Sequence, residues 1–206
     1  MRKPLIFRKI AAFLLVFVIL FPIGIKMTAM RVHAKNKKKK VKKMEVLSVG
    51  GAPSEMPLKI IGDNNCRDQV AGALENLRDH DEDAYQRVLG NIGIVECSAD
   101  GSGTFVWESP ARIKLGQATR ASGPVWLAGV MSHESCHAGQ YKDYRLSHPD
   151  SSVPTEIYSG AEAESQCLHL QYQTLSRVGS GKSTLEYVKQ IAATSYWDIP
   201  YEKRWW

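Results

Sequence analysis

The feature that most constrains this chain is the run over residues 131–137, where two histidines flank a glutamate at a fixed spacing. If the run is helical, His133 and His137 are four residues apart and their imidazoles leave the same face. Two neutral imidazoles suit a zinc ion, which lies ~2.0–2.1 Å from each nitrogen. Glu134 then projects beside the metal, where its carboxylate can take a proton from a water and pass it to a leaving group. This is the chemistry of the H-E-x-x-H pattern, so we expect Glu134 to be the catalytic base.

A catalytic zinc site has three protein ligands and one open position, so a third ligand must come from elsewhere in the chain. We favour Glu164. The spacing of Ile157, Ala161, Leu168 and Leu175 predicts a helix with an apolar stripe, and Glu164 falls on that stripe. A carboxylate on a buried face is costly unless it is paired or binds a metal. Without such a third ligand, the two histidines would be an accidental pair on a helix surface.

The cysteines form an even set of four: Cys66, Cys97, Cys136 and Cys167. Cys136 is three residues after His133, on about the same helix face, and Cys167 stands in the same relation to Glu164. If the two helices meet at a metal, Cys136 and Cys167 can form a disulfide one turn away, which leaves the other two cysteines to pair. The alternatives are four buried thiols or a cysteine ligand. Helical geometry disfavours the ligand, because Cys136 points about 100° away from the histidine that follows it.

Residues 133–137, followed by a predicted helix that carries a glutamate, resemble the motifs of gluzincin-type zinc metallopeptidases. The resemblance spans about residues 60–178. It implies a zincin-like domain in which a small sheet lies beside the H-E-x-x-H helix. It also implies one zinc ion bound by His133, His137 and Glu164, with Glu134 as the general base for peptide-bond hydrolysis.

Glu162 is an alternative third ligand. Gluzincins often carry Asp or Asn four residues after the ligand Glu, where it orients a histidine through a hydrogen bond. That position is Leu168 for Glu164, but it is Gln166, which can hydrogen-bond, for Glu162. The apolar stripe and the cysteine spacing nevertheless favour Glu164. Asp143, six residues after the second histidine, is disfavoured because the chain lacks the glycine that would turn it back.

The apolar pattern predicts an α+β fold that is mainly α, with a small sheet beside the H-E-x-x-H helix. Residues 68–89 are expected to be helical, with an interruption at the acidic residues 79–83. Three segments read as strands, the second returning beside the first after a turn: residues 92–97, 104–107 and 112–116. The helix of the motif is expected to begin at residues 123–124 with a proline in its first turn. The next helix should begin near residue 155.

The N-terminal region is expected to be a targeting segment. Basic residues precede an apolar run over residues 10–25, and small residues near position 34 suit a signal peptidase. The run is shorter than the ~20 residues typical of a membrane span, which favours cleavage, whereas the lysines that follow favour retention. We therefore assign residues 1–34 to a signal peptide or membrane anchor. Residues 35–58 are assigned to a basic disordered linker and residues 59–206 to the metallopeptidase domain.

Charge is unevenly divided along the chain. Thirteen of the 27 Lys and Arg residues lie within the first 43 positions, and none of the 21 acidic residues does. The remaining chain is therefore net acidic, which argues against a nucleic-acid partner. The basic segment suits contact with anionic lipid head groups at a membrane surface.

These observations predict an exported protein, secreted or periplasmic, with residues 10–25 as a membrane anchor if they are retained. It would bind one zinc ion and hydrolyse a peptide or protein substrate. The alternative is a disulfide-stapled, zinc-binding structural or interaction module without turnover. A cytoplasm-facing membrane protein with free thiols is a third reading.

Overall fold

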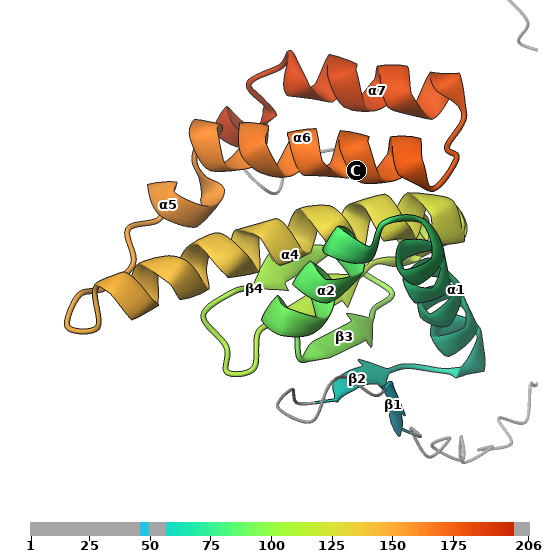
Figure 1. The fold of residues 1–206 in the computed structure, drawn as a ribbon, viewed down its shortest axis with the longest axis horizontal. Helices are drawn as coiled ribbons and strands as arrows, with labels where there is room; N and C mark the ends of the chain where they lie inside the picture. Colours follow the sequence, from blue (N-terminus) through green and yellow to red (C-terminus); the bar gives the residue numbers. More distant parts are fainter. Residues whose placement is uncertain (1–45, 50–56, 200–206) are drawn as a thin grey trace, which may run out of the picture. The chain divides into compact units, whose positions relative to one another are not determined.

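The structure, a computed structural model, describes residues 46–49 and 57–199. It confirms a mainly helical α+β architecture with a small sheet (Figure 1). In chain order the elements are β1 (Val46–Val49), β2 (Leu58–Ile61), α1 (Asn64–His80), α2 (Glu82–Asn91), β3 (Ile94–Cys97), β4 (Gly103–Phe105), β5 (Arg112–Leu115), α3 (Gln117–Ala121), α4 (Pro124–Ser147), α5 (Glu156–Ser159), α6 (Ala161–Arg177), α7 (Lys182–Ala192) and η1 (Tyr196–Asp198). Within the described residues no helix is long and apolar enough to span a membrane.

The predicted signal peptide or anchor over residues 1–34 lies outside the described residues. Most of the predicted linker, residues 35–58, lies outside them as well. The strand β1 falls inside this range and pairs with β2, so some of the segment belongs to the sheet. Neither β1 nor β2 was anticipated from the apolar pattern.

The five strands are ordered β1-β2-β3-β5-β4, with parallel pairing between β2 and β3 and between β3 and β5. Val95 of β3 lies opposite Ile60 and Ile113, and all three side chains are fully buried. The predicted hairpin between residues 92–97 and 104–107 is therefore wrong, because β5 lies between β3 and β4. β5 buries Ile113 and Leu115, whereas β4 has no buried side chain. The strand that buries apolar side chains takes the inner place, and β4 forms one edge.

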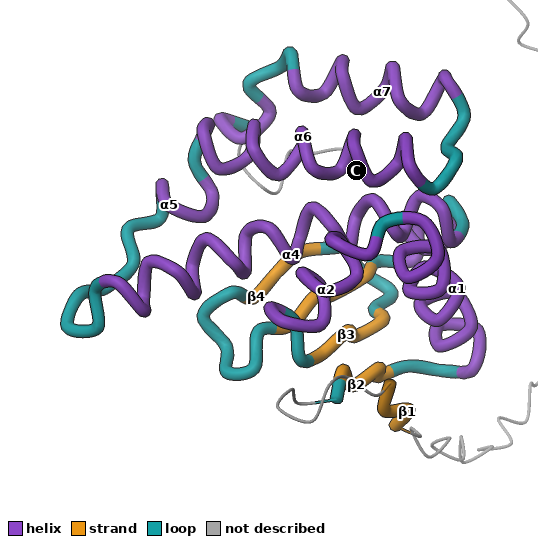
Figure 2. The backbone as a smooth tube through the Cα atoms, viewed as in Figure 1, coloured by secondary structure: helices purple, strands orange, loops and turns teal. Residues whose placement is uncertain are grey.

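The helix α4 is the central element of the fold. It begins at Pro124, as predicted, where a missing N–H costs nothing in the first turn. Its side chains are buried almost continuously from Leu127 to Ala138, and it contacts α1, α2, α3, α5, α6 and β4. A helix that is buried on all sides belongs to the core. Figure 2 shows the strands below α4 in this view, with α6 and α7 above it.

The helices α4 and α6 pack closely. A Cβ atom added to Gly129 of α4 would lie 2.6 Å from the Cγ atom of Leu175, so the absence of a side chain permits this approach. The single helix predicted from residue 155 is instead two helices, α5 and α6. They are separated by Gly160, which is extended at φ −91° and ψ 176°.

Both predicted disulfides are present. Cys66 pairs with Cys97 and ties α1 to β3, while Cys136 pairs with Cys167 and ties α4 to α6. No cysteine is left free. Such bonds are typical of proteins in oxidising compartments, which agrees with the predicted export.

The α1–α2 corner is organised by Asp81, which confirms the interruption predicted at residues 79–83. Its side chain caps α2 by accepting from the backbone N–H of Ala84, and its own N–H donates to Leu77. The Asp81 side chain is buried, and its carboxylate also accepts from Thr174 at 2.7 Å and from Arg177 at 2.6 Å. One carboxylate thus joins this corner to α6.

Replacing Asp81 with alanine is expected to lower the free energy of unfolding by about 2–4 kcal/mol. The change removes a helix cap and takes the carboxylate acceptor away from the buried Thr174 hydroxyl and from Arg177. Urea unfolding with both disulfides intact, followed by circular dichroism, measures this loss. Asp79→Ala is the matched control, because Asp79 is exposed and pairs with Arg78 on the surface. Equal shifts of the urea midpoint in both variants would contradict the assigned role.

Candidate metal centre and adjoining cavity

Three side chains from two helices converge: His133 and His137 of α4, and Glu164 of α6. The two Nε2 atoms are 2.9 Å apart. The Oε2 atom of Glu164 is 3.5 Å from His133 Nε2 and 3.4 Å from His137 Nε2. Two ligands at ~2.0–2.1 Å from a tetrahedral zinc lie ~3.3–3.4 Å apart, so these atoms are spaced like the ligands of one ion. The group can therefore hold a metal ion.

The local fold brings Glu164, and neither alternative, to the histidines. Glu164 is 6 % exposed on the face of α6 that meets α4. Glu162 is exposed and accepts a hydrogen bond from Gln166 at 3.3 Å, on the solvent side of the helix. Asp143 is exposed as well. The apolar stripe predicted from sequence is thus the feature that identified the converging carboxylate.

The disulfide between α4 and α6 borders the three-residue group. The Sγ atom of Cys167 lies 3.4 Å from Nδ1 of His137, so this ring directs Nδ1 at the disulfide and Nε2 at Glu164. The Nδ1 atom of His133 is buried and has no hydrogen-bond partner among the residues that the structure describes. The imidazoles therefore meet Glu164 through Nε2, the nitrogen that a metal would use.

Charge at the group is set by competition between burial and pairing. Burial opposes a charge on His137, but hydrogen bonding and attraction from Glu164 outweigh it and raise the pKa of His137. Burial likewise favours the neutral acid at Glu164, but hydrogen bonds from both imidazoles hold the pKa of Glu164 well below its usual range. The metal-free group thus keeps an anionic carboxylate beside an imidazole that retains a proton to higher pH than usual.

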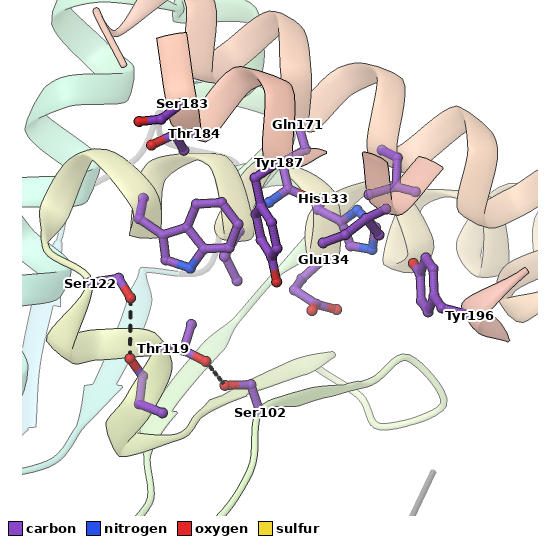
Figure 3. Close-up of a pocket in the computed structure, with 15 residues that line it drawn as sticks. Ser102, Thr119, Ser122, His133, Glu134, Gln171, Ser183, Thr184, Tyr187 and Tyr196 are labelled. Atoms are coloured by element: carbon purple, nitrogen blue, oxygen red, sulfur yellow. Dashed lines mark hydrogen bonds between the residues drawn. The ribbon is translucent and has the colours of Figure 1, made fainter. Parts of the chain in front are cut away.

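A cavity of about 510 Å³ adjoins the group, and His133 and Glu134 lie at one end of it (Figure 3). Glu134 is half-buried, and its carboxylate accepts a hydrogen bond from the hydroxyl of Thr104 on β4. At the same end, the hydroxyl of Tyr196 on η1 donates to the Glu164 carboxylate. The arrangement therefore offers a group able to hold a metal, a neighbouring carboxylate outside that group, and open space in front of both.

Sequence reasoning missed several of these residues. Thr104 and Tyr196 reach the group from a strand and a short helix that no motif marks. Three other tyrosines of α4 and α5 lie elsewhere: Tyr141 packs edge-on against Tyr158, and Tyr144 stacks on His148 at the far end of α4. None of these three lines the cavity.

Comparison with protein-family models, with curated proteins and with solved structures finds no match to this chain. The resemblance to gluzincins therefore rests on the residues of the two motifs.

Removing either kind of donor is expected to abolish metal binding. His137→Ala and Glu164→Ala should retain less than about a tenth of the zinc held by the wild-type protein, because two ligands bind far more weakly than three. Elemental analysis after dialysis measures the metal per chain. Glu162→Ala is the matched control. Glu162 lies on the same helix but is exposed, so this variant should keep its metal. Loss of metal from Glu162→Ala alone would reassign the ligand.

Metal affinity is expected to fall as the pH is lowered. Below the raised pKa of His137, each pH unit should cost about tenfold in affinity, because one proton must leave before the imidazole can bind a metal. Above that pKa the affinity should level off. Competition with a chromophoric chelator between pH 5.5 and 8.5 measures this dependence. In the metal-free protein the pKa of His137, followed by NMR, should be lower in Glu164→Gln than in the wild type, since the partner that raises it is gone.

Proposed function

We propose that this protein is an exported zinc metallopeptidase of the gluzincin type, with a zincin-like fold. The observation that carries the proposal is the triangle of His133 Nε2, His137 Nε2 and Glu164 Oε2, with sides of 2.9, 3.4 and 3.5 Å. These spacings suit three ligands of one zinc ion. Among the described residues that line the adjoining cavity, Glu134 is the one carboxylate.

The three ligands would hold one zinc ion, which when bound supplies Lewis acidity for peptide-bond hydrolysis. Glu134 is the general base in this proposal. Its carboxylate lies at the cavity end, where it can take a proton from a water and then deliver that proton to the leaving amine. Glu134 follows a ligand directly on α4, so the helix that orients the histidines also fixes the carboxylate.

Two hydroxyl groups would position the carboxylates. Thr104 of β4 donates to Glu134 and restrains the side chain of the base. Tyr196 donates to Glu164, and this hydrogen bond would orient the carboxylate for ligation, as partners of metal ligands commonly do. Both contacts come from outside the two metal-binding helices, which gives each carboxylate a fixed direction.

The edge strand β4 supports a peptide as the substrate. It pairs with β5 on one side and has no strand on its other side within the described sheet. A peptide in extended form can add to such an edge through backbone hydrogen bonds. Because Thr104 on this strand touches Glu134, an added peptide would pass the proposed base.

The second candidate is a zinc-binding structural module without turnover. It is favoured by burial, because all three donor residues are less than a tenth exposed and a disulfide ties their helices together. A structural zinc site, however, fills all four positions with protein ligands. Only three side chains converge in the described part of the chain, which favours the enzyme.

Export to the periplasm or the exterior is part of the proposal. It is supported by the two disulfides, which form and persist in oxidising compartments. The basic residues of the first 43 positions would allow contact with anionic lipid at a membrane surface.

The decisive experiment is Glu134→Gln. It should reduce peptide hydrolysis by about 10²–10⁴-fold while zinc content stays at the wild-type level, since only a proton-transfer group is lost. Cleavage of a mixed peptide pool, followed by mass spectrometry alongside elemental analysis, gives both quantities. Glu162→Gln makes the same chemical change on an exposed residue and should cleave normally. Equal behaviour of wild type and Glu134→Gln would support the structural module.

A further inference from the structure

The walls of the cavity differ from its metal end. Away from Glu134 the lining is formed by large apolar side chains: Trp126, Val130, Leu168, Tyr187 and Ile191. These belong to α4, α6 and α7, three separate helices. The volume of about 510 Å³ lies within the range of ~300–1,000 Å³ typical of ligand sites. The lining contains no lysine or arginine that would pair with a ligand's negative charge.

Gln171 is a polar exception in this apolar wall. It lies two turns after Glu164 on α6, is 5 % exposed, and lines the cavity. Its side chain makes no hydrogen bond to any residue that the structure describes, although Thr174 and Glu164 on the same helix are both bonded. Figure 3 draws it at the same part of the cavity as Tyr187 and His133. The amide therefore keeps its donors and acceptor available at the cavity, where a ligand can bond to them.

An aromatic pair stands at the cavity mouth. The rings of Trp126 and Tyr187 have centroids 6.0 Å apart and are tilted by 50°. Tyr187 is 39 % exposed, whereas most large apolar side chains in the described residues are buried. An exposed aromatic beside an apolar cavity marks a surface that a ligand can cover.

We propose that the cavity binds a bulky aromatic side chain of a peptide, and that Gln171 hydrogen-bonds the peptide group next to it. The volume and apolar walls suit an aromatic ring, which packs edge-on or tilted against other rings. The Gln171 amide both donates and accepts, which matches a peptide group. This inference deepens the proposed function and takes its peptide substrate from it.

The far end of the cavity sets the chemical range of the side chain. Ser122, Ser183 and Thr184 lie there, opposite the metal end (Figure 3). Their hydroxyls can accept or donate to a phenol, so tyrosine should be bound as well as phenylalanine. A glutamate side chain would be desolvated against the apolar walls without a lysine or arginine partner, so it should bind more weakly than the aromatic ones.

The test uses the full chain with Glu134→Gln and bound zinc, so that binding is measured without turnover. The probes are blocked pentapeptides, acetyl-Gly-Gly-Xaa-Gly-Gly-amide, with Phe, Tyr, Ala or Glu at the variable position. Dissociation constants come from NMR titration, which reaches the millimolar range. The Phe and Tyr peptides should bind at least tenfold more tightly than the Ala peptide, because they bury a large apolar side chain. The indole N–H signal of Trp126 should shift on binding.

Two variants separate the parts of the site. Ala118→Trp adds bulk at the cavity rim, on an exposed position of α3, and should remove the preference for Phe over Ala. Gln171→Met keeps the side-chain length but removes the amide, and should weaken the Phe and Ala peptides equally, by about fivefold to tenfold. Gln173→Met is the matched control, because Gln173 bonds to His169 on the exposed side of α6. It should bind like the parent.

Phe and Ala peptides bound within twofold of each other, no binding of any probe, or shifts away from Trp126 would each overturn the inference. If the wild-type protein cleaves no peptide but the Phe probe binds beside Trp126, the proposed function fails and the binding site stands. If cleavage depends on Glu134 but shows no aromatic preference in a mixed pool, the proposed function stands and this inference fails.

Discussion

The contact between α4 and α6 is the interaction on which the rest of the structure depends. The two helices run antiparallel, so residue numbers rise along α4 while the numbers of their partners fall along α6. Gly129 meets Leu175, then Ser132 meets Thr174 at 2.8 Å. One turn later comes the disulfide between α4 and α6, and then Gln140 donates to Gln166 at 3.1 Å.

This register places the donor atoms in the middle of the contact. His133 lies between the hydroxyl pair and the disulfide, and His137 directly follows Cys136. Glu164 faces both histidines from one turn before Cys167. A slip of α6 by a single residue would rotate its carboxylate by about 100° away from the histidines. Both the close packing at Gly129 and the disulfide therefore fix the rotation of α6 relative to α4.

Burying Glu164 has a cost that the surrounding groups offset. An isolated carboxylate at this depth would be strongly disfavoured, yet the two imidazoles and the Tyr196 hydroxyl all direct polar hydrogens or nitrogens at it. Without a metal, the three side chains form a charged network in which a proton on an imidazole supplies the positive charge. Metal binding and proton binding are consequently alternatives at one place, which couples the site to pH.

The parts of this structure that follow from local pattern could be predicted from sequence. The histidines four apart, the carboxylate on an apolar stripe and the cysteines one turn beyond the donors are all readings of helical period. What could not be predicted depends on contacts between distant segments. Insertion of β5 between β3 and β4 follows from which strand buries apolar side chains. This strand order brings Thr104 to Glu134, and helix packing brings Gln171 to the cavity.

The position of Glu134 gives the strongest reason to treat the group as more than a structural tie. A structural site gains nothing from an unliganded carboxylate beside the metal, because that charge must be partly desolvated without binding anything. Here the Thr104 hydroxyl donates to this carboxylate and holds it at the end of a cavity. The helices α4 and α6, which carry the three donor residues, also form part of the cavity wall. The rest of the helical wall comes from α3 and α7, which carry none of the donors. The proposed peptide hydrolysis would use all three features, the Glu134 carboxylate, the open space and the edge strand, whereas a structural zinc site requires none of them.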